Sequence, residues 1–246
     1  MSRESGAHIS TTTQRLLVVC AVDAEAAAVA APFAVDEAPV GRLAARRLHA
    51  AGATVDVVTC GIGPAAAAAA TAFCLGAGSY DAVLSAGIAG AFVDGSAQVG
   101  GLAVADTIVF ADLGVLSPDG FESIATLGFG DGLERVVPSA TAVAALTQRC
   151  ASTGLPVATG PVLTLATFTG TDARAKELAA RLSPVAEAME GSGVACAAAM
   201  AGVPALEVRS ISNLVGDRDR DAWDLPAALS ALTAASAALF VEPVPL

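Results

Sequence analysis

Two carboxylates and one amide follow apolar stretches of this 246-residue sequence and are its best candidates for chemistry. Glu25 lies just beyond the apolar run 16–22, and Glu190 ends another such run. Asn213 follows a third run, 204–211. A carboxylate can activate water or stabilise a developing positive charge, and an amide can both donate and accept hydrogen bonds. Side by side, these groups could recognise a small polar molecule from two directions.

A structural role is equally open for each of these side chains. Glu190 could cap a helix that begins at Gly191, and Asn213 could simply open a turn. Glu25 could be a surface acid in the first turn of a helix, where the helix dipole favours a negative charge. The spacing alone does not choose between the two kinds of role.

The elements that must position these residues follow an alternating α/β pattern. The segment 189–219 has the order strand end, helix, strand, which is typical of a parallel unit that binds ligands beyond the carboxyl ends of its strands. The predicted strands are 16–22, 42–50, 54–59, 80–85, 102–111, 155–167, 184–189 and 204–211. The predicted helices are 24–31, 65–75, 139–150, 171–182, one that begins at 191, and 225–240.

Two glycine-rich turns, 60–64 and 86–90, are predicted to open at one edge of the sheet and to favour a pocket there. Their backbone N–H groups could face an anion or a sugar, although close packing also explains such glycines. The stretch 112–135 is predicted to be a long irregular loop, of the kind that serves as a lid or an interface. In it, Phe121 and Phe129 could close over a ligand or anchor the loop.

The composition predicts a compact fold and argues against several partners. The chain is 54% hydrophobic, and its net charge of −11 would repel nucleic acid and anionic membranes. Residues 1–14 are predicted to be a flexible polar tail, and residues 15–246 a single domain. The apolar run 16–22 is too short for a signal peptide or a membrane span.

The cysteines and histidines give no indication of a metal site or a cofactor. The five cysteines form no CxxC pair and mostly lie in apolar patterns, which predicts reduced core thiols in a cytoplasmic protein rather than a catalytic nucleophile. His8 and His49 are the only histidines, and His8 lies in the polar tail. They do not form a zinc-binding pattern.

Five segments together resemble the nucleoside phosphorylase/nucleosidase superfamily, and most closely its methylthioadenosine/S-adenosylhomocysteine nucleosidase branch. They are AVDAEAAAV, CGIGPAAAA, SAGIAGAF, AMEGSGVA and RSISNLVGDRD, in the order and spacing of that family. The resemblance begins at about Leu16 and implies an α/β fold in three layers, with a central mixed twisted β-sheet flanked by helices. It also implies a homodimer or larger homo-oligomer that binds a small-molecule nucleoside.

The resemblance assigns roles to individual residues. It implies that Glu25 is the general base that activates water, and that Glu190 holds the ribose hydroxyls and stabilises the cation-like transition state. Asn213 would bond the edge of the leaving purine. The other implied substrate contacts are the stacking ring of Phe168, the sugar-packing Met189, Ser212, and the backbone of Ala86, Gly87 and Ile88.

Asn213 departs from the adenine-specific nucleosidases, which carry an aspartate at this place. Asparagine followed by LVGDRDRDAW resembles the futalosine hydrolases, which cleave futalosine to hypoxanthine and dehypoxanthinylfutalosine in menaquinone biosynthesis. An amide NH₂ can donate to N7 or O6 of hypoxanthine, whereas the acceptor of a carboxyl group would be left unpaired against O6. Asn213 therefore favours a 6-oxopurine.

Three rival functions stay open. The chain could cleave methylthioadenosine, S-adenosylhomocysteine or aminodeoxyfutalosine. It could be a purine nucleoside phosphorylase, although neither 60–64 nor 81–92 contains a Lys or Arg to bind phosphate, and Arg42, Arg46 or a neighbouring subunit would have to supply one. It could also bind nucleosides without catalysis, but such a protein would not need a second acid at the water position.

Overall fold

The computed structural model describes residues 13–129, 132–219 and 221–246. In them the strands are β1 (Gln14–Cys20), β2 (Val35–Glu37), β3 (Ala45–His49), β4 (Ala53–Thr59), β5 (Ala82–Ala91), β6 (Leu102–Phe110), β7 (Gly114–Ser117), β8 (Gly120–Ser123), β9 (Arg135–Val136), β10 (Val157–Thr164), β11 (Ala186–Ala188) and β12 (Ala205–Leu214). The helices are α1 (Asp23–Ala30), α2 (Pro64–Ala77), α3 (Ala140–Ala151), α4 (Asp172–Leu182), α5 (Gly191–Met200) and α6 (Leu225–Leu239). Most of the predicted tail 1–14 lies outside the described residues, and Gln14 already belongs to β1.

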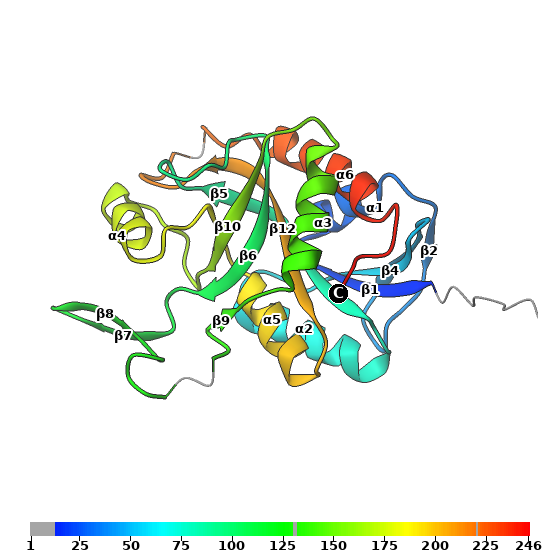
Figure 1. Ribbon diagram of the computed structural model, residues 1–246, viewed down its shortest axis with the longest axis horizontal. Helices are drawn as coiled ribbons and strands as arrows, with labels where there is room; N and C mark the ends of the chain where they lie inside the picture. The colour runs from blue at the N-terminus through cyan, green and yellow to red at the C-terminus, as the bar shows by residue number, and fades with distance from the viewer. Residues whose placement is uncertain (1–12, 130–131, 220) are drawn as a thin grey trace, which may run out of the picture.

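A mixed sheet forms the centre of the molecule (Figure 1). Its strand order is β11-β10-β6-β12-β5-β1-β4-β3-β2, with β9 paired to β6. Strand β5 pairs in parallel with β1 and β12 and also antiparallel with β11, so one side of the sheet curls back onto its centre. The parallel and antiparallel pairings of this sheet, with the helices that flank it, confirm the predicted central mixed sheet flanked by helices.

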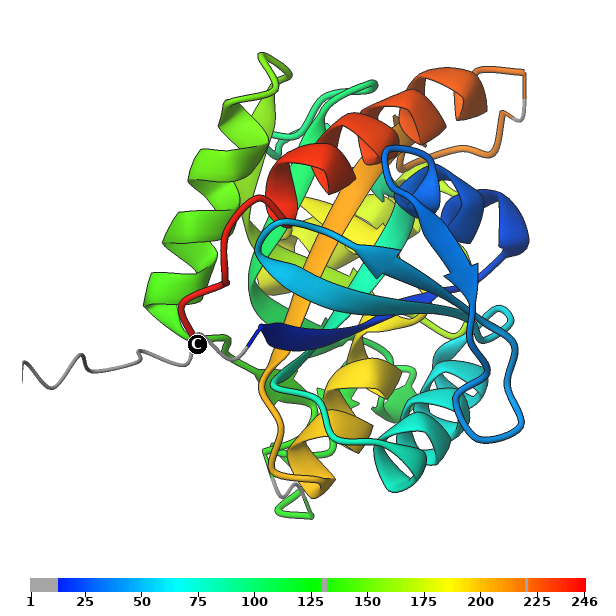
Figure 2. The same ribbon diagram turned by 90° about the vertical axis from the view of Figure 1, so that its right-hand side faces the viewer.

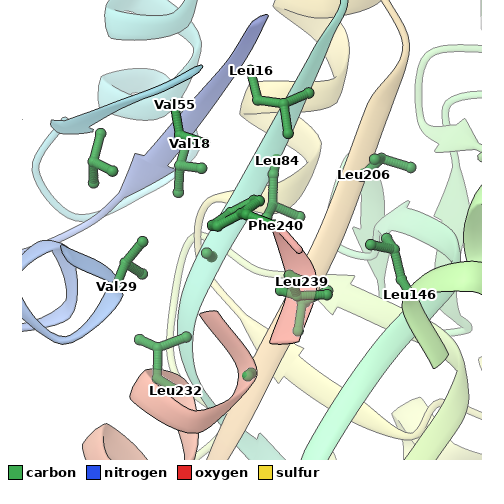
Figure 3. Close-up of a cluster of buried hydrophobic side chains, with 14 of the residues drawn as sticks. Leu16, Val18, Val29, Val55, Leu84, Leu146, Leu206, Leu232, Leu239 and Phe240 are labelled. Atoms are coloured by element: carbon green, nitrogen blue, oxygen red, sulfur yellow. The ribbon is translucent and has the colours of Figure 1, made fainter. Parts of the chain in front are cut away.

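Helices cover both faces of the sheet (Figure 2). Helices α1, α3 and α6 pack on one face, and α2 and α5 pack on the other. Figure 3 shows Val29 of α1, Leu146 of α3 and Leu232 of α6 gathered against Val18 and Leu84 of the sheet. No helix in the described part of the chain is long and apolar enough to cross a membrane.

The second glycine-rich segment, 86–90, is not a turn as predicted but part of the carboxyl half of β5. Its glycines allow neighbouring side chains to approach the strand. A Cβ on Gly87 would lie 2.5 Å from Glu25 Oε1, and one on Gly90 would lie 3.1 Å from Asn213 Nδ2. The prediction was wrong because a glycine in a strand can mark such a close approach instead of a turn.

The strands on either side of α5 do not form the parallel unit that was predicted. Strand β12 runs parallel to β5 and β11 runs antiparallel to it, so β11 and β12 point in opposite directions. Their polar residues still converge, because both strands pair with the carboxyl half of β5. The stretch 112–135 is also more regular than predicted, since β7 and β8 form a hairpin that projects from the body of the molecule (Figure 1).

Candidate active site

A pocket opens where the carboxyl half of β5 meets β11 and β12. It encloses about 670 Å³ of space, part of it open to solvent. Its lining consists of Ala21, Val22, Glu25, Ile62, Ile88, Ala89, Gly90, Phe168, Thr169, Glu187, Ala188, Met189, Glu190, Ser212, Asn213 and Trp223. All the predicted site residues are among them except Ala86 and Gly87.

Glu25 is a buried carboxylate in the first turn of α1, not a surface acid, with 3% of its residue surface exposed. Its Oε2 accepts hydrogen bonds from the backbone N–H groups of Ala21 (2.9 Å) and Val22 (3.1 Å), and its Oε1 accepts one from Ile88 (2.9 Å). The carboxylate therefore ties the end of β1 to β5. Burial raises the pKa of Glu25, although the N–H of Ile88 and the charge of Arg209 act in the opposite direction.

Glu190 stands between β11 and α5 and is also buried. It occupies the N-cap position of α5, but its side chain makes no capping hydrogen bond. Instead, Oε1 accepts from the N–H of Gly63 (3.1 Å), and Oε2 accepts from Arg209 Nη1 (3.2 Å) and the N–H of Met189 (3.3 Å). The side chain is thus fixed beside the pocket rather than used to cap the helix.

Close packing between α2 and α5 brings the turn 60–64 to Glu190. A Cβ on Gly193 would lie only 2.1 Å from the carbonyl oxygen of Pro64, so glycine is required at this crossing. Two N–H groups of the turn bind other parts of the protein: Gly61 donates to the carbonyl of Ala21 (2.9 Å) and Gly63 donates to Glu190 (3.1 Å). The N–H groups of Gly61 and Gly63 are therefore not free to bind an anion in this arrangement.

Arg209 is a buried cation behind the two carboxylates and was not predicted from the sequence. It donates to Glu190 (3.2 Å), to Glu207 Oε1 (2.8 Å) and to Ser85 Oγ (2.8 Å). Burial acts to lower its pKa, but Glu207, Glu190 and Glu25 raise the pKa above its ordinary value. The sequence does carry a signal, because Glu207 and Arg209 are two residues apart in a predicted buried strand and therefore lie on the same face of it.

Asn213 lies in β12 and not in a turn. A β-bulge between Ile211 and Asn213 shifts the register against β5 and directs Ser212 and Asn213 into the same pocket. Asn213 Oδ1 accepts from Ser212 Oγ (2.8 Å), and Asn213 Nδ2 donates to the carbonyl of Leu214 (2.9 Å). An amide NH₂ carries two hydrogens, so the second can be offered to a ligand.

Two aromatic rings form one wall of the pocket. Phe168 follows β10 and is 55% exposed, so it is not a core residue. Its ring meets the ring of Trp223 edge-on, with 6.2 Å between centroids. Trp223 was not predicted as a site residue, although a tryptophan beside a polar strand end is a reasonable signal for a flat ligand.

The pocket holds a third carboxylate, that of Glu187, which was also not predicted. Only 7% of the residue surface of Glu187 is exposed. Thr169 donates to it through both the backbone N–H (3.0 Å) and the hydroxyl (2.6 Å). Strand β11 is entirely buried, so the apolar-like run 184–189 concealed a polar residue that faces a cavity.

The remaining predicted residues lie outside the pocket. Ala86 and Gly87 belong to β5, and Gly87 backs the Glu25 carboxylate. The ring of Phe121 lies 4.2 Å from the guanidinium carbon of Arg181, and Phe129 is 78% exposed. Neither phenylalanine closes over the pocket in this structure.

The charge of the pocket suits a developing cation better than an anion. None of its described lining residues is Lys or Arg. Arg46 pairs instead with Asp23 at 2.6 Å, and Arg42 is exposed elsewhere.

Burial, reinforced by the charge of Glu190, raises the pKa of the nearby Cys60 thiol to about 12, which keeps it protonated. The described residues contain no group of three or more His, Cys, Asp or Glu side chains that could hold a metal ion.

The chain belongs to the phosphorylase superfamily, whose family model matches residues 15–242. Within it, the chain is similar to the futalosine hydrolase of Streptomyces coelicolor, at 46% identity over 89% of this chain and 92% of that protein. It is likewise similar to the futalosine hydrolase of Acidothermus cellulolyticus, at 45% identity over 91% of this chain and 89% of that protein.

Solved structures share the fold. The 5'-methylthioadenosine/S-adenosylhomocysteine nucleosidase of Helicobacter pylori, bound to butyl-thio-DADMe-Immucillin-A, superposes with a TM-score of 0.77 at 21% identity, covering 91% of this chain and 95% of that one. The futalosine hydrolase of Helicobacter pylori superposes with a TM-score of 0.76 at 22% identity, covering 92% and 95%. At these identities the likeness concerns the fold.

Proposed function

We propose that this protein hydrolyses the N-glycosidic bond of futalosine and releases hypoxanthine and dehypoxanthinylfutalosine, a reaction of menaquinone biosynthesis. The observation that carries the proposal is the convergence of Glu25, Glu190 and Asn213 on one pocket. The similarity to two futalosine hydrolases over most of the chain supports the same substrate.

The geometry supports a separate role for each of these three residues in the reaction. Cleavage builds positive charge on the ribosyl carbon and negative charge on the leaving base. Glu25, held by three backbone N–H groups, would orient and deprotonate the attacking water. Glu190, fixed by Gly63 and Arg209, would hold the ribose hydroxyls and stabilise the positive charge. Asn213 would donate to the base as it leaves.

The other predicted contacts would complete the substrate site. Phe168, which lies at the pocket wall with Trp223, would stack on the purine. Met189 and the backbone at Ile88 would pack against the sugar, and Ser212 would orient the amide of Asn213 through its hydroxyl.

Water is favoured over phosphate as the nucleophile. A phosphate site needs cations or free backbone N–H groups. The described lining holds no Lys or Arg, and Gly61 and Gly63 already donate to protein acceptors. Three carboxylates would also repel a phosphate dianion.

The proposal is tested by incubating the purified protein with futalosine, with and without phosphate, and separating the products by chromatography. We expect hypoxanthine and the free sugar at the same rate in both reactions. A phosphate requirement with a sugar 1-phosphate product would make the protein a phosphorylase. Faster cleavage of methylthioadenosine or aminodeoxyfutalosine would favour an adenine-type nucleosidase, and tight binding without base release would favour a non-catalytic role.

We also infer a homo-oligomer in the cytoplasm. Leu116 and Phe129, in and after the projecting hairpin, are 77% and 78% exposed, and a partner subunit that covered them would remove this apolar surface from water. The five cysteines are all free, which is consistent with a reducing compartment. Light scattering of the purified protein would give its oligomeric state.

A further inference from the structure

Glu187 is a pocket carboxylate that the proposed reaction does not use. Its two oxygens accept hydrogen bonds only from Thr169, at 3.0 and 2.6 Å, among the bonds that the described residues form. No Lys or Arg nitrogen of the described chain lies within ion-pair distance of it. Each carboxylate oxygen can accept a second hydrogen bond, so Glu187 retains acceptor capacity toward the pocket.

A buried carboxylate with unused acceptor capacity costs free energy unless a ligand in the pocket donates a hydrogen bond to it. Burial raises the pKa of Glu187, and the two bonds from Thr169 and the charge of Arg174 only partly offset this effect. A buried carboxylate that forms no ion pair with the described residues and lies in a cleft is a candidate for ligand recognition. The question is which ligand atom would donate to it.

The sheet places Glu187 opposite Asn213. In β11 Glu187 pairs with Gly90 of β5, and in β12 Asn213 pairs with the same glycine from the other side. Residues paired across strands point to the same face of a sheet. Neighbouring strands are about 4.8 Å apart, so the two Cα atoms are within roughly 10 Å of each other.

Gly90, the strand residue between Glu187 and Asn213, lets the Asn213 amide approach the backbone of β5. It has no side chain of its own, and a Cβ there would lie 3.1 Å from Asn213 Nδ2 and 2.9 Å from Val215 Cγ2, so a larger residue would collide with the Asn213 amide. Glu187, Gly90 and Asn213 all line the pocket beside Phe168. A flat base that stacks on Phe168 would therefore present its edge to an amide and a carboxylate together.

The hydrogen-bonding edge of a 6-oxopurine matches this pair. N7 and O6 are acceptors, one of which the remaining N–H of the Asn213 amide can satisfy, and N1 beside C6 carries a hydrogen that needs an acceptor. Adenine has the opposite pattern at these positions, with an N6 donor and an N1 acceptor. A carboxylate would bind N1–H of hypoxanthine and would face the N1 lone pair of adenine without a hydrogen between them.

We propose that Glu187 accepts a hydrogen bond from N1–H of the purine and, with Asn213, selects a 6-oxopurine over adenine. The inference rests on the proposed function, because it concerns recognition of the base of the same substrate. Thr169 orients the carboxylate through its two donors.

The test measures binding of the free bases, hypoxanthine, 1-methylhypoxanthine and adenine, by calorimetry, so that it does not depend on turnover. In the unaltered protein, 1-methylhypoxanthine should bind roughly 10-fold or more weakly than hypoxanthine, because it lacks the N1 hydrogen. Equal affinity for these two bases would overturn the proposal without any variant. This comparison uses only the unaltered protein, so it is valid even if substitution of Glu187 harms folding.

Glu187→Gln should then change the ratio of hypoxanthine to adenine affinity by roughly 10- to 100-fold in favour of adenine, since its amide can donate to N1 of adenine. Glu242→Gln, an exposed glutamate near the carboxyl terminus, is the matched control and should leave the ratio unchanged. Structural damage would weaken both bases alike, so a common loss with an unchanged ratio would overturn the proposal. Failure of the unaltered protein to cleave futalosine would instead refute the proposed function and leave the base-binding result to stand by itself.

Discussion

The guanidinium of Arg209 donates to the Glu190 carboxylate at 3.2 Å, and through its other nitrogens it holds Glu207 and Ser85 at 2.8 Å each. With 1% of its residue surface exposed, Arg209 is a fixed internal cation. It sets the position of Glu190 and offsets the charge of acids that would otherwise repel one another. The geometry of the candidate site therefore depends on a residue that does not line the pocket.

Arg209→Lys should preserve the fold and impair the reaction. Lysine keeps the positive charge, but a single ammonium cannot bridge three acceptors that a planar guanidinium reaches. We expect kcat and kcat/KM for futalosine to fall together by about 10- to 100-fold, because a better-held Glu190 matters most in the transition state. Steady-state kinetics and thermal melting would be compared with Arg42→Lys, an exposed control. A rise in KM alone would contradict a positioning role.

Glu25→Gln should abolish most turnover while hypoxanthine still binds. Loss of a general base typically costs a factor of about 10² to 10⁴. The substitution also has a local structural effect. A glutamine oxygen can satisfy Ala21 and Val22, but its NH₂ group then faces the N–H of Ile88. The melting temperature must therefore be measured beside kcat, and normal turnover in a folded variant would remove Glu25 from the mechanism.

The pH dependence follows from the same carboxylate. Burial raises the pKa of Glu25 above its ordinary value of 4.5, so protonation begins at a higher pH than for an exposed glutamate. A base must be deprotonated to act, and kcat/KM should decline as the pH falls through the raised pKa. A profile of kcat/KM against pH should show this acid limb with its inflection above 4.5. An inflection at or below that value would contradict the assignment.

The sequence allows the fold and the central acids to be predicted, but not the full site. Glu25, Glu190 and Asn213 follow apolar strands, and local pattern locates such strand ends. Glu187 could not be found in that way, because its place in the pocket depends on antiparallel pairing of β11 with the distant β5. That pairing involves few residues, and no local periodicity indicates it.

The glycines of β5 are a second case in which the sequence pattern alone could not predict the structure. Gly87 and Gly90 are extended strand residues, chosen because Glu25, Arg209 and Asn213 approach the backbone there. The sequence shows the glycines but not the side chains that surround them. A turn and a crowded strand therefore look alike until the tertiary contacts are known.

A second ionic cluster, away from the pocket, should control stability. Asp56 of β4 is fully buried and accepts hydrogen bonds from Arg47 (2.7 and 3.0 Å), Arg15 (3.0 Å) and Tyr80 (2.8 Å). Burial acts to raise the pKa of Asp56, but the bonds from Arg47, Tyr80 and Arg15 prevail and lower it below its ordinary value of 3.8. A lowered pKa in the folded state stabilises the protein above the unfolded-state pKa, and this contribution is lost as pH falls through the folded-state pKa.

Asp56→Asn should lower the free energy of unfolding by about 1–3 kcal/mol at neutral pH, because the charge-assisted bonds are weakened. The difference from the unaltered protein should shrink as the pH falls from 3.8 toward the lower pKa of folded Asp56, and be lost where the folded protein also becomes protonated there. Denaturant unfolding at a series of pH values measures both effects. A difference that is constant with pH would show that the charge of Asp56 is not responsible.

The amide of Asn213 is expected to select the purine, and Asn213→Asp tests this expectation with little change in volume. In the structure, Nδ2 donates to the carbonyl of Leu214 at 2.9 Å while Oδ1 accepts from Ser212. An ionised aspartate would put an oxygen against that carbonyl and would have no donor for N7 or O6 of hypoxanthine. An unpaired polar group in such a site costs about 1–3 kcal/mol, or roughly one to two decades in kcat/KM.

Protonation of the new carboxyl group would restore a donor, and that form suits a 6-amino purine, since one oxygen can donate to N7 while the other accepts from N6. Asn213→Asp should therefore increase kcat/KM for aminodeoxyfutalosine relative to futalosine, whatever its absolute activity. The measurement is the ratio of the two values in Asn213→Asp and in the unaltered protein, with melting temperature as a control for folding. If the ratio does not change, position 6 of the base is not recognised by Asn213, and Glu187 or the backbone at Thr169 becomes the next group to test.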